Sequence, residues 1–427
     1  MSEWVDRSIK DLCIAIVDCV NKTAPSQEAP PTSFKMLRTT NVRGGWVNTS
    51  NVKYVDESTY AKWTRRMVPK RGDIILTREA PFGDVGMIRN DDKVFLGQRL
   101  VMYRADESEC DPYFLMYSML GPVVQAELKS LGSGATVEHL RVPDCERITI
   151  PSPPLPCQRR IGAILKSIDD LIENNRRRVE VLEEMARAIY REWFVKFRYP
   201  GHEEVPLVDS PLGPIPDGWT VQRSSDAILV NPKVKLDRSV DHPFIAMGNL
   251  NERGMACYPS DVRTGGSGAK FENGDTLFAR ITPSLENGKT GFVQCLADNE
   301  IGMGSTEFIV LRGNQVGPAF TYCLSRNEDF RRNAIASMSG ASGRQRVRNE
   351  CFDNYLVAVP PTDLAQRFEG VAKPLFVDID ILHREAESAA TLRDLLLPKL
   401  VTGKIDVSTL DLDAVVSTGS TTERGVA

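Results

Sequence analysis

The stretch RGDIILTR at residues 71–78 returns as NGDTLFAR at residues 273–280. The flanking features return in the same order. Before each stretch a tryptophan is followed by an aspartate, and after it a proline-rich segment leads to a Gln-Arg pair. These features are Trp4, Asp11 and residues 158–159 in the first copy, and Trp219, Asp226 and residues 366–367 in the second. A long internal repeat of this kind predicts two copies of one structural unit.

The chain has 427 residues, enough for about two or three domains with cores of their own, and the repeat favours two. Its nine cysteines include no Cys-x-x-Cys pair and its four histidines lie far apart, so their spacing predicts neither a disulfide framework nor a metal site. The N-terminal stretch lacks a basic region followed by an apolar run, and no apolar stretch reaches membrane length. We therefore expect a cytoplasmic protein that does not span a membrane.

The net charge of −4 and the isoelectric point near 5.8 do not by themselves favour a nucleic-acid partner. Phosphate binding, however, requires basic residues on one face rather than an excess over the whole chain. Basic residues cluster within residues 62–71 and again within residues 331–348. Each cluster is interpreted equally well as ordinary solvated surface.

A long helix is predicted after Pro156, because apolar residues there alternate four and three positions apart. They are Ile161, Leu165, Ile168, Ile172, Val179, Leu182, Ala186, Ile189 and Trp193. This heptad pattern would extend on the order of 50 Å. Asn175 lies in the same register, where a polar side chain is costly unless a partner meets it, so we expect it to fix the register of a helix pair.

A second helix repeats this spacing near the C-terminus. Its apolar positions are Phe368, Ala372, Leu375, Ile379, Leu382, Ala386, Ala389, Leu396 and Leu400, and the pattern is interrupted at Arg393. Pro374 lies inside it and predicts either a kink or a late start of the helix. We expect the two helices to pack on each other, antiparallel, as a spacer between the two repeated units.

The rest of the chain shows short strand and turn signals, with short helices expected at 113–129 and 318–336. The predicted fold class is α+β, with two pseudo-repeated α/β globules separated by two long antiparallel helices that form a coiled-coil spacer. The expected boundaries are 1–155 for the first globule, 156–199 for the first helix, 200–361 for the second globule, 362–406 for the second helix and 407–427 for a disordered tail.

Several sequence motifs and their order make the chain resemble the specificity (S) subunit of a type I restriction-modification system. They are LEEMA at 182–186 and WF at 193–194 closing the first helix, GPIPDGW at 213–219 opening the second globule, LLLPKLVTGKI at 395–405 closing the second helix, and the Gly-Asp strand that ends in arginine in both globules. The resemblance covers the chain up to about residue 407.

The resemblance implies a protein without catalytic activity of its own. Each globule would be a target recognition domain that reads one half of a bipartite site in double-stranded DNA. The helices would space the two domains and dock methyltransferase (M) subunits, two of which we expect, and restriction (R) subunits would join. No cofactor is expected on this chain. S-adenosylmethionine, and ATP with Mg for restriction, are expected on the partner subunits, which flip and methylate the target base.

Two motifs that would indicate catalysis are interpreted structurally. An amino-methyltransferase loop ends in an aromatic residue, whereas SPPL at 152–155 ends in leucine and fits the exit from a strand into a helix. A phosphate-binding loop needs a glycine five positions before its Gly-Lys-Thr, and Gly288-Lys289-Thr290 has Pro283 there, which favours a hairpin turn. Three alternatives stay open: a DNA-binding subunit of a related phage-defence methyltransferase complex, a self-contained DNA methyltransferase, and a coiled-coil scaffold for proteins.

Polar loops at matching places in the two copies are the candidates for DNA contact, because Arg reads guanine and Asn or Gln reads adenine most often. The candidates are Arg38, Thr39, Asn41, Arg78, Glu79, Gln98, Arg99, Ser133 and Thr136 in the first globule, and Asn249, Arg280, Thr282, Ser305, Thr306, Arg344, Gln345 and Arg346 in the second. The candidates for spacing or partner contact are Asn175, Arg176, Arg177, Trp193, Phe194, Leu396 and Leu400. The Gly- and Ser-rich loops and the arginines after Asn175 can equally be solvated surface.

Helix length also predicts the spacing of the DNA site. A spacer of about 40 to 50 Å corresponds to little more than one turn of B-DNA. We expect two half-sites of about three to five base pairs that flank an unread gap of about five to eight.

Overall fold

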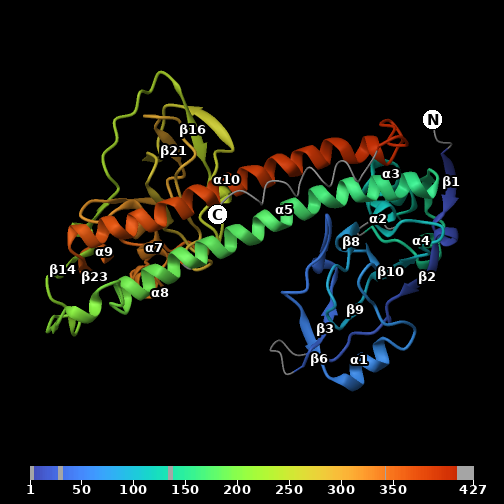
Figure 1. Ribbon diagram of the computed structural model, residues 1–427, viewed down its shortest axis with the longest axis horizontal. Coiled ribbons are helices and arrows are strands. Elements are labelled where there is room, and N and C mark those ends of the chain that lie inside the picture. The colour runs from blue at the N-terminus through green and yellow to red at the C-terminus, as the bar shows by residue number, and fades with distance from the viewer. Residues whose placement is uncertain (1–3, 27–31, 133–137, 342, 411–427) are drawn as a thin grey trace. The chain divides into compact units, whose positions relative to one another are not determined.

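The computed structural model describes residues 4–26, 32–132, 138–341 and 343–410. The chain divides into two compact units, Met1–Leu171 with Ser388–Ala427 (unit 1) and Ile172–Glu387 (unit 2). Two long helices, α5 (Leu155–Tyr190) and α10 (Thr362–Leu400), each contribute one part to unit 1 and the other part to unit 2 (Figure 1). Within the described residues, no helix is both long and apolar enough to cross a membrane.

Unit 1 is built around a six-stranded sheet of order β2-β10-β7-β8-β5-β4, beside a three-stranded sheet of order β6-β3-β9 and the pair β1-β11. The strands are β1 (Val5–Ser8), β2 (Cys13–Asp18), β3 (Phe34–Leu37), β4 (Val42–Arg43), β5 (Gly45–Val47), β6 (Lys53–Val55), β7 (Ile74–Arg78), β8 (Phe82–Met87), β9 (Val94–Leu96), β10 (Leu100–Ala105) and β11 (Thr149–Ser152). The short helices are η1 (Ile9–Leu12), η2 (Thr39–Asn41), α1 (Glu57–Trp63), α2 (Pro112–Leu120), α3 (Pro122–Leu131) and α4 (Val142–Cys145).

Unit 2 contains two four-stranded sheets, of order β15-β22-β19-β20 and β17-β16-β21-β18, and the pairs β14-β23 and β12-β13. The strands are β12 (Leu207–Val208), β13 (Ile215–Pro216), β14 (Thr220–Arg223), β15 (Ile228–Val230), β16 (Asp241–Ile245), β17 (Asp261–Thr264), β18 (Ala269–Phe271), β19 (Thr276–Ala279), β20 (Thr290–Phe292), β21 (Gly302–Gly304), β22 (Phe308–Gly313) and β23 (Leu356–Val359). The short helices are η3 (Arg191–Val195), η4 (His202–Glu204), α6 (Ser224–Ala227), η5 (Met247–Asn249), α7 (Pro318–Arg326), α8 (Glu328–Ala336) and α9 (Cys351–Asn354).

The predicted repeat is a repeat of the fold. The strand order β2-β10-β7-β8 of unit 1 matches β15-β22-β19-β20 of unit 2. The parallel pair β3–β9 matches the parallel pair β16–β21, and the antiparallel closure β1–β11 matches β14–β23. Strands β4 and β5 extend the main sheet of unit 1 only.

The repeated Gly-Asp dipeptide forms the turn that precedes β7 and β19. Gly72 and Gly274 both have φ of 92°, in the left-handed region that favours glycine. The buried Asp73 carboxylate accepts a hydrogen bond from the backbone N–H of Lys70 at 2.8 Å and two more from the guanidinium of Arg104, both at 2.7 Å. Asp275 makes the same paired contacts with Arg312 in unit 2, at 2.6 and 2.7 Å. The motif therefore returns because it holds the turn and a neighbouring strand together.

The two long helices run antiparallel within each unit. In unit 1, Asp169 of α5 forms an ion pair with Arg393 of α10 at 3.0 Å. In unit 2, Asn175 of α5 donates to Glu385 of α10 at 3.1 Å, so the seam asparagine has the partner that its position required. Helix α10 begins at Thr362 and continues past Pro374, so the expected late start at this proline is wrong.

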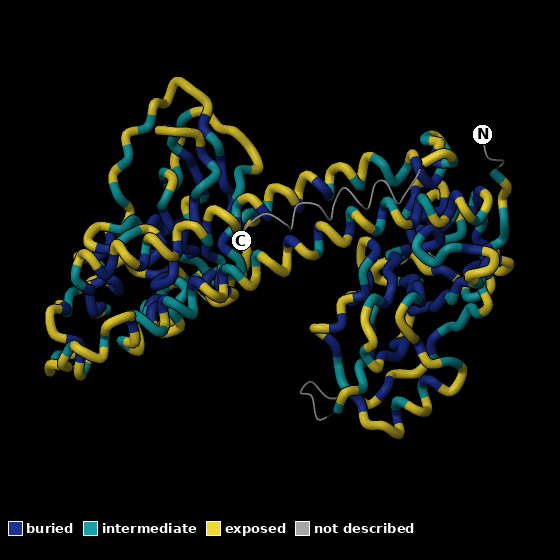
Figure 2. The backbone as a smooth tube through the Cα atoms, in the orientation of Figure 1, coloured by how far each residue is buried: buried dark blue, intermediate teal, exposed yellow. Residues whose placement is uncertain are grey.

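The apolar seams of the helices enter the cores of both units (Figure 2). In unit 2, Phe368, Phe376 and Ile379 of α10 are at most 1 % exposed. In unit 1, Ile161 and Leu165 of α5 are equally buried. The helices are thus structural parts of the globules at both ends, because burial of their apolar faces stabilises the helix and the sheet together.

Local sequence signals explain why each of the two predicted short helices is divided. Each predicted short helix is two helices, because Pro122 starts a new helix after Gly121 and the Asn327 side chain caps α8 by accepting from the backbone N–H groups of Asp329 and Phe330. The tail expected to be disordered begins at residue 407, yet Val407 is buried in the core of unit 1. The tail beyond Leu410 lies outside the described residues.

Replacing Phe368 by alanine should destabilise unit 2 by about 3 to 5 kcal/mol, because the side chain is fully buried among Tyr190, Trp193 and Phe194. The matched control is Val371→Ala on the same helix, at a position that is 42 % exposed, with an expected change within about 0.5 kcal/mol. Chemical denaturation measures both variants. Equal effects of the two substitutions would contradict the placement of this helix face in the core.

Candidate nucleic-acid interface

Three of the polar loops predicted for the first globule meet at the end of β7. The backbone N–H of Arg78 donates to the carbonyl of Arg99 at 2.8 Å, and its guanidinium donates to the carbonyl of Leu140 at 3.2 Å. The hydroxyl of Thr39 donates to the carbonyl of Ala80 at 2.8 Å. Residues 38–41, 78–81 and 97–99 therefore form one polar surface in unit 1, with Leu140 at its edge.

The corresponding loops meet at the end of β19 in unit 2. The backbone N–H of Arg280 donates to the carbonyl of Glu307 at 3.0 Å, and its guanidinium donates to the carbonyl of Val347 at 2.9 Å. The backbone N–H of Thr282 donates to the carbonyl of Gln345 at 3.0 Å. Arg78 and Arg280 thus occupy the same place in the two units, and each ties a distant segment to the end of the Gly-Asp strand.

Asn41 and Asn249 also occupy matching places, and both hold a turn. The side-chain oxygen of Asn41 accepts from the backbone N–H of Arg38, and that of Asn249 accepts from Ala246, both at 2.8 Å. Asn41 is buried and its amide donates to the carbonyl of Asn51 at 2.7 Å. A base contact by Asn41 would require these hydrogen bonds to break, whereas Asn249 is partly exposed.

The charged candidates form ion pairs on these surfaces. In unit 1, Arg99 pairs with Glu79 at 3.2 Å, and in unit 2, Arg346 pairs with Glu307 at 2.6 Å. The hydrogen bonds from Arg346 lower the pKa of the Glu307 carboxyl, so this pair is charged at neutral pH. Both arginines are about half exposed.

The remaining candidates for DNA contact are distributed over the same surfaces. Gln98, Thr306 and Arg344 are exposed, while Arg38, Thr282, Ser305 and Gln345 are partly buried. Ser133 and Thr136 lie outside the described residues. Within the described residues, no group of three or more His, Cys, Asp or Glu side chains is arranged to hold a metal ion.

The candidates for spacing and partner contact divide into exposed and packed residues. Arg176 and Arg177 are exposed, and Arg177 pairs with Glu173 on its own helix at 2.7 Å. Phe194 is buried in the core of unit 2, where Trp193 packs beside it. The leucines of α10, Leu396 and Leu400, pack on the core of unit 1.

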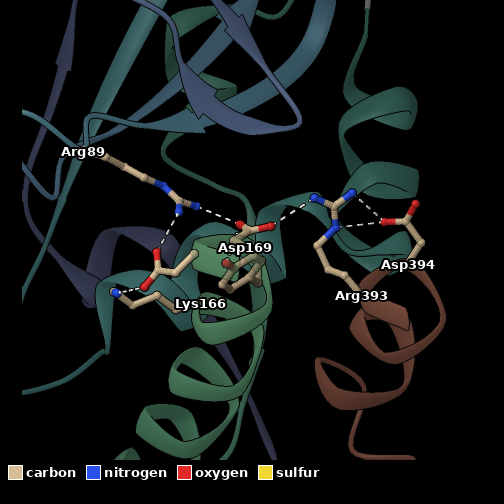
Figure 3. A network of polar contacts seen from close by, with 7 residues as sticks. Arg89, Lys166, Asp169, Arg393 and Asp394 are labelled. Carbon is tan, nitrogen blue, oxygen red and sulfur yellow. Dashed lines mark hydrogen bonds and ion pairs between the residues drawn. The ribbon is translucent and has the colours of Figure 1, made fainter. Parts of the chain in front are cut away.

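A buried carboxylate that sequence reasoning missed joins the first globule to both helices (Figure 3). Asp169 of α5 is 1 % exposed. It accepts from Arg89 of the globule at 2.8 Å and from Arg393 of α10 at 3.0 Å. It also accepts from the hydroxyl of Tyr117 at 2.6 Å. Arg89 in turn stacks on the ring of Trp46, 3.7 Å from its centroid.

A second buried carboxylate on α5, Glu183, has the same role in unit 2. It accepts from the hydroxyl of Tyr322 at 2.6 Å and from the backbone N–H of Met255 at 2.9 Å. Arg326 lies 3.8 Å from it and also donates to the Tyr322 oxygen at 2.9 Å. Burial raises the pKa of the Tyr322 hydroxyl well above its usual range, so this group stays protonated and donates.

The sequence carried one signal for these contacts. Arg393 is the residue that interrupts the apolar spacing of α10, and a charged residue on a buried seam requires a partner. Asp169 and Glu183 lie beside the seam of α5 rather than on it, so heptad spacing did not single them out.

Comparison with known proteins finds similarity to DNA specificity subunits. Residues 1–184 match the family described as "Type I restriction modification DNA specificity domain". The MjaIX type I restriction enzyme specificity subunit of Methanocaldococcus jannaschii is 25 % identical over 376 residues, covering 83 % of this chain and 82 % of the relative. The putative MjaX specificity subunit of the same organism is 22 % identical over 427 residues, covering 95 % of each chain.

A solved structure has a similar fold. The crystal structure of the type I restriction-modification system S subunit from M. genitalium superimposes with a TM-score of 0.57 at 15 % sequence identity. The similarity covers 93 % of this chain and 96 % of the other. At this identity the match concerns the fold, and both repeated units lie within it.

Replacing Asp169 by asparagine should destabilise unit 1 by about 3 to 5 kcal/mol, because it leaves Arg89 and Arg393 without their shared buried partner. The matched control is Asp170→Asn, since the neighbouring carboxylate is itself 50 % exposed, pairs with the part-exposed Lys166 and lies farther from Arg89, at 3.8 Å, so the expected change is under about 1 kcal/mol. Thermal unfolding compares the two. Similar stability of both variants would show that the Asp169 network does not hold the globule on the helices.

Proposed function

We propose that the chain is a type I restriction-modification specificity subunit, a proposal supported by its similarity to the specificity-domain family over residues 1–184 and to specificity subunits over most of its length. It is a non-catalytic DNA-recognition subunit, and the polar surface at the end of the Gly-Asp strand in each unit reads one half of a bipartite site in double-stranded DNA. The observation that supports this most is the recurrence of the same loop assembly, at Arg78 in unit 1 and at Arg280 in unit 2.

The chemistry of these surfaces suits a nucleic acid. Arginine, glutamine, threonine and serine side chains supply donors for base edges and phosphates, and backbone hydrogen bonds hold the loops that carry them. Rigid loops are needed because sequence reading depends on the placement of donors within hydrogen-bond distance. The helices supply the spacing, since α5 alone has 36 residues and is therefore about 54 Å long.

The methyl transfer and DNA cleavage are assigned to partners. We propose that methyltransferase subunits, two per chain, dock on the helical region and carry S-adenosylmethionine, and that restriction subunits supply the ATP- and Mg-dependent step. The specificity chain itself binds none of these cofactors. It acts in the cytoplasm, where cellular and invading DNA are both accessible to the complex.

A self-contained methyltransferase is less well supported by the structure. The SPPL stretch connects β11 to the start of α5, so it has the structural role of a strand-to-helix exit. Gly288-Lys289-Thr290 lies at the end of the connection between the antiparallel strands β19 and β20. A specificity subunit of a related phage-defence methyltransferase complex stays an alternative that the identity of the partner subunits would decide.

Co-expression with its methyltransferase subunit in a host without DNA methylation should produce adenine methylation at one bipartite motif. The motif should be absent when this chain is omitted, and genome-wide methylation mapping measures both. The purified chain alone should neither bind S-adenosylmethionine nor methylate DNA. Methylation by the chain alone would instead support the self-contained enzyme.

Lengthening the helices should change the gap of the recognised site. We expect that four residues inserted between Asn175 and Val179, with four inserted between Leu382 and Glu385 of α10, widen the gap by about one or two base pairs. The second insertion preserves the antiparallel pairing that Asn175 and Glu385 define. The control substitutes residues in the same segments without changing their length. An unchanged gap would contradict the spacer role of the helices.

A further inference from the structure

An arginine braced by a glutamate lies on the candidate interface of unit 2. Nε of Arg346 donates to the Glu307 carboxylate at 2.9 Å, and Nη2 donates to it at 2.6 Å. The Arg346 side chain is 48 % exposed and that of Glu307 is 22 % exposed. Glu307 is also the residue whose carbonyl accepts the backbone N–H of Arg280, so the pair lies where the loops meet.

The geometry of this pair leaves a recognition edge of the arginine available. A guanidinium presents two edges with paired N–H donors, one formed by Nε and Nη2 and one by Nη1 and Nη2. Glu307 occupies the first edge. Arg346 contacts Glu307 through Nε and Nη2, so its terminal edge, formed by Nη1 and the second N–H of Nη2, is suited to donate to O6 and N7 of guanine.

Unit 1 also has an exposed arginine–glutamate ion pair on its polar surface, although only Arg99 and Glu307 occupy matching places in the two units. Nε of Arg99 pairs with Glu79 at 3.2 Å, and the Arg99 side chain is 52 % exposed. The backbone carbonyl of Arg99 accepts a hydrogen bond from the backbone N–H of Arg78. Arg99 therefore occupies the place in unit 1 that Glu307 occupies in unit 2. Its φ of 68° is uncommon for a residue other than glycine, and such conformations concentrate at binding sites.

Ordinary surface stabilisation and phosphate binding explain these pairs less well than base reading. Exposed ion pairs contribute little to stability, so stability alone gives no reason to hold an arginine in a disfavoured backbone conformation. A glutamate beside a phosphate would repel it, because like charges would be brought together. At a base edge, by contrast, a carboxylate is compatible with a G·C pair, since it can accept from N4 of cytosine while arginine donates to guanine.

We propose that Arg99 and Arg346 each read a guanine, one in each half of the bipartite site, and that Glu79 and Glu307 are positioning residues that orient them. This inference rests on the proposed function and adds the base and the residue that determine specificity. The recognised motif should therefore contain at least one G·C pair in each half-site. A half-site without guanine on either strand would overturn the inference for its unit.

The test is genome-wide methylation mapping of the assembled complex carrying Arg346→Lys or Arg99→Lys. Lysine keeps the charge but lacks the planar fork, so each variant should lose about tenfold discrimination at one G·C position of its own half-site and leave the other half-site unchanged. The matched control is Arg332→Lys, since Arg332 pairs with Asp329 on α8 at 3.0 Å and should leave the motif intact.

The glutamates are tested by Glu307→Gln in duplex-binding assays with the same complex. Removing the negative charge should strengthen binding to unrelated DNA while weakening discrimination at one G·C pair of the second half-site. A merely structural role would instead lower both affinities together with the melting temperature. Glu79→Gln should act in the same way on the first half-site only.

The outcomes separate this inference from the function on which it rests. If the wild-type complex produces no bipartite methylation, the proposed function fails. If it does, but the lysine variants keep full stringency, or lose affinity uniformly for all sequences as phosphate contacts would, the assignment of Arg99 and Arg346 to guanine fails alone.

Discussion

One buried carboxylate on α5 holds each recognition globule to the helices, Asp169 in unit 1 and Glu183 in unit 2. A carboxylate removed from water is costly unless its oxygens accept several hydrogen bonds. Each meets this need with a tyrosine hydroxyl and with donors from the globule, including Arg89 in the first case and the Met255 backbone in the second. Because all these donors must be in place at once, the globule has a defined position on its part of the helix.

A second constraint fixes the position of the polar loops for which DNA contact is proposed. The Gly-Asp turn and its buried aspartate–arginine pair, Asp73 with Arg104 or Asp275 with Arg312, set the start of the strand whose end bears Arg78 or Arg280. The guanidinium groups of those arginines donate hydrogen bonds to backbone carbonyls of segments distant in the chain, at Leu140 in unit 1 and at Val347 in unit 2. The same chain of contacts is built twice, which is what reading two separated stretches of one duplex requires.

Much of this was predictable because it depends on local pattern. The repeat, both long helices, the need of Asn175 for a partner and the matching places of the polar loops followed from spacing and order in the sequence, whereas the convergence of those loops did not. The structural role of Asn41 was not predictable, since an asparagine side chain can cap a turn or read adenine equally well. The helix does not start late at Pro374 because burial of neighbouring residues such as Phe376 and Ile379 outweighs one lost helical hydrogen bond. The contacts of Asp169 and Glu183, and the ion pairs that Arg99 and Glu307 form, join segments far apart in the chain. The periodicity of the sequence does not predict such contacts.

The central claim, that each unit contacts its own half of one DNA site, is tested most directly by site-specific photo-crosslinking. A crosslinking amino acid replaces exposed Gln98 in unit 1 or exposed Thr306 in unit 2, and the assembled complex is irradiated on a duplex carrying its methylation motif. We expect crosslinks from position 98 in one half-site and from position 306 in the other, with none in the gap between them. Crosslinks from both positions to the same half-site, or to neither, would contradict the account.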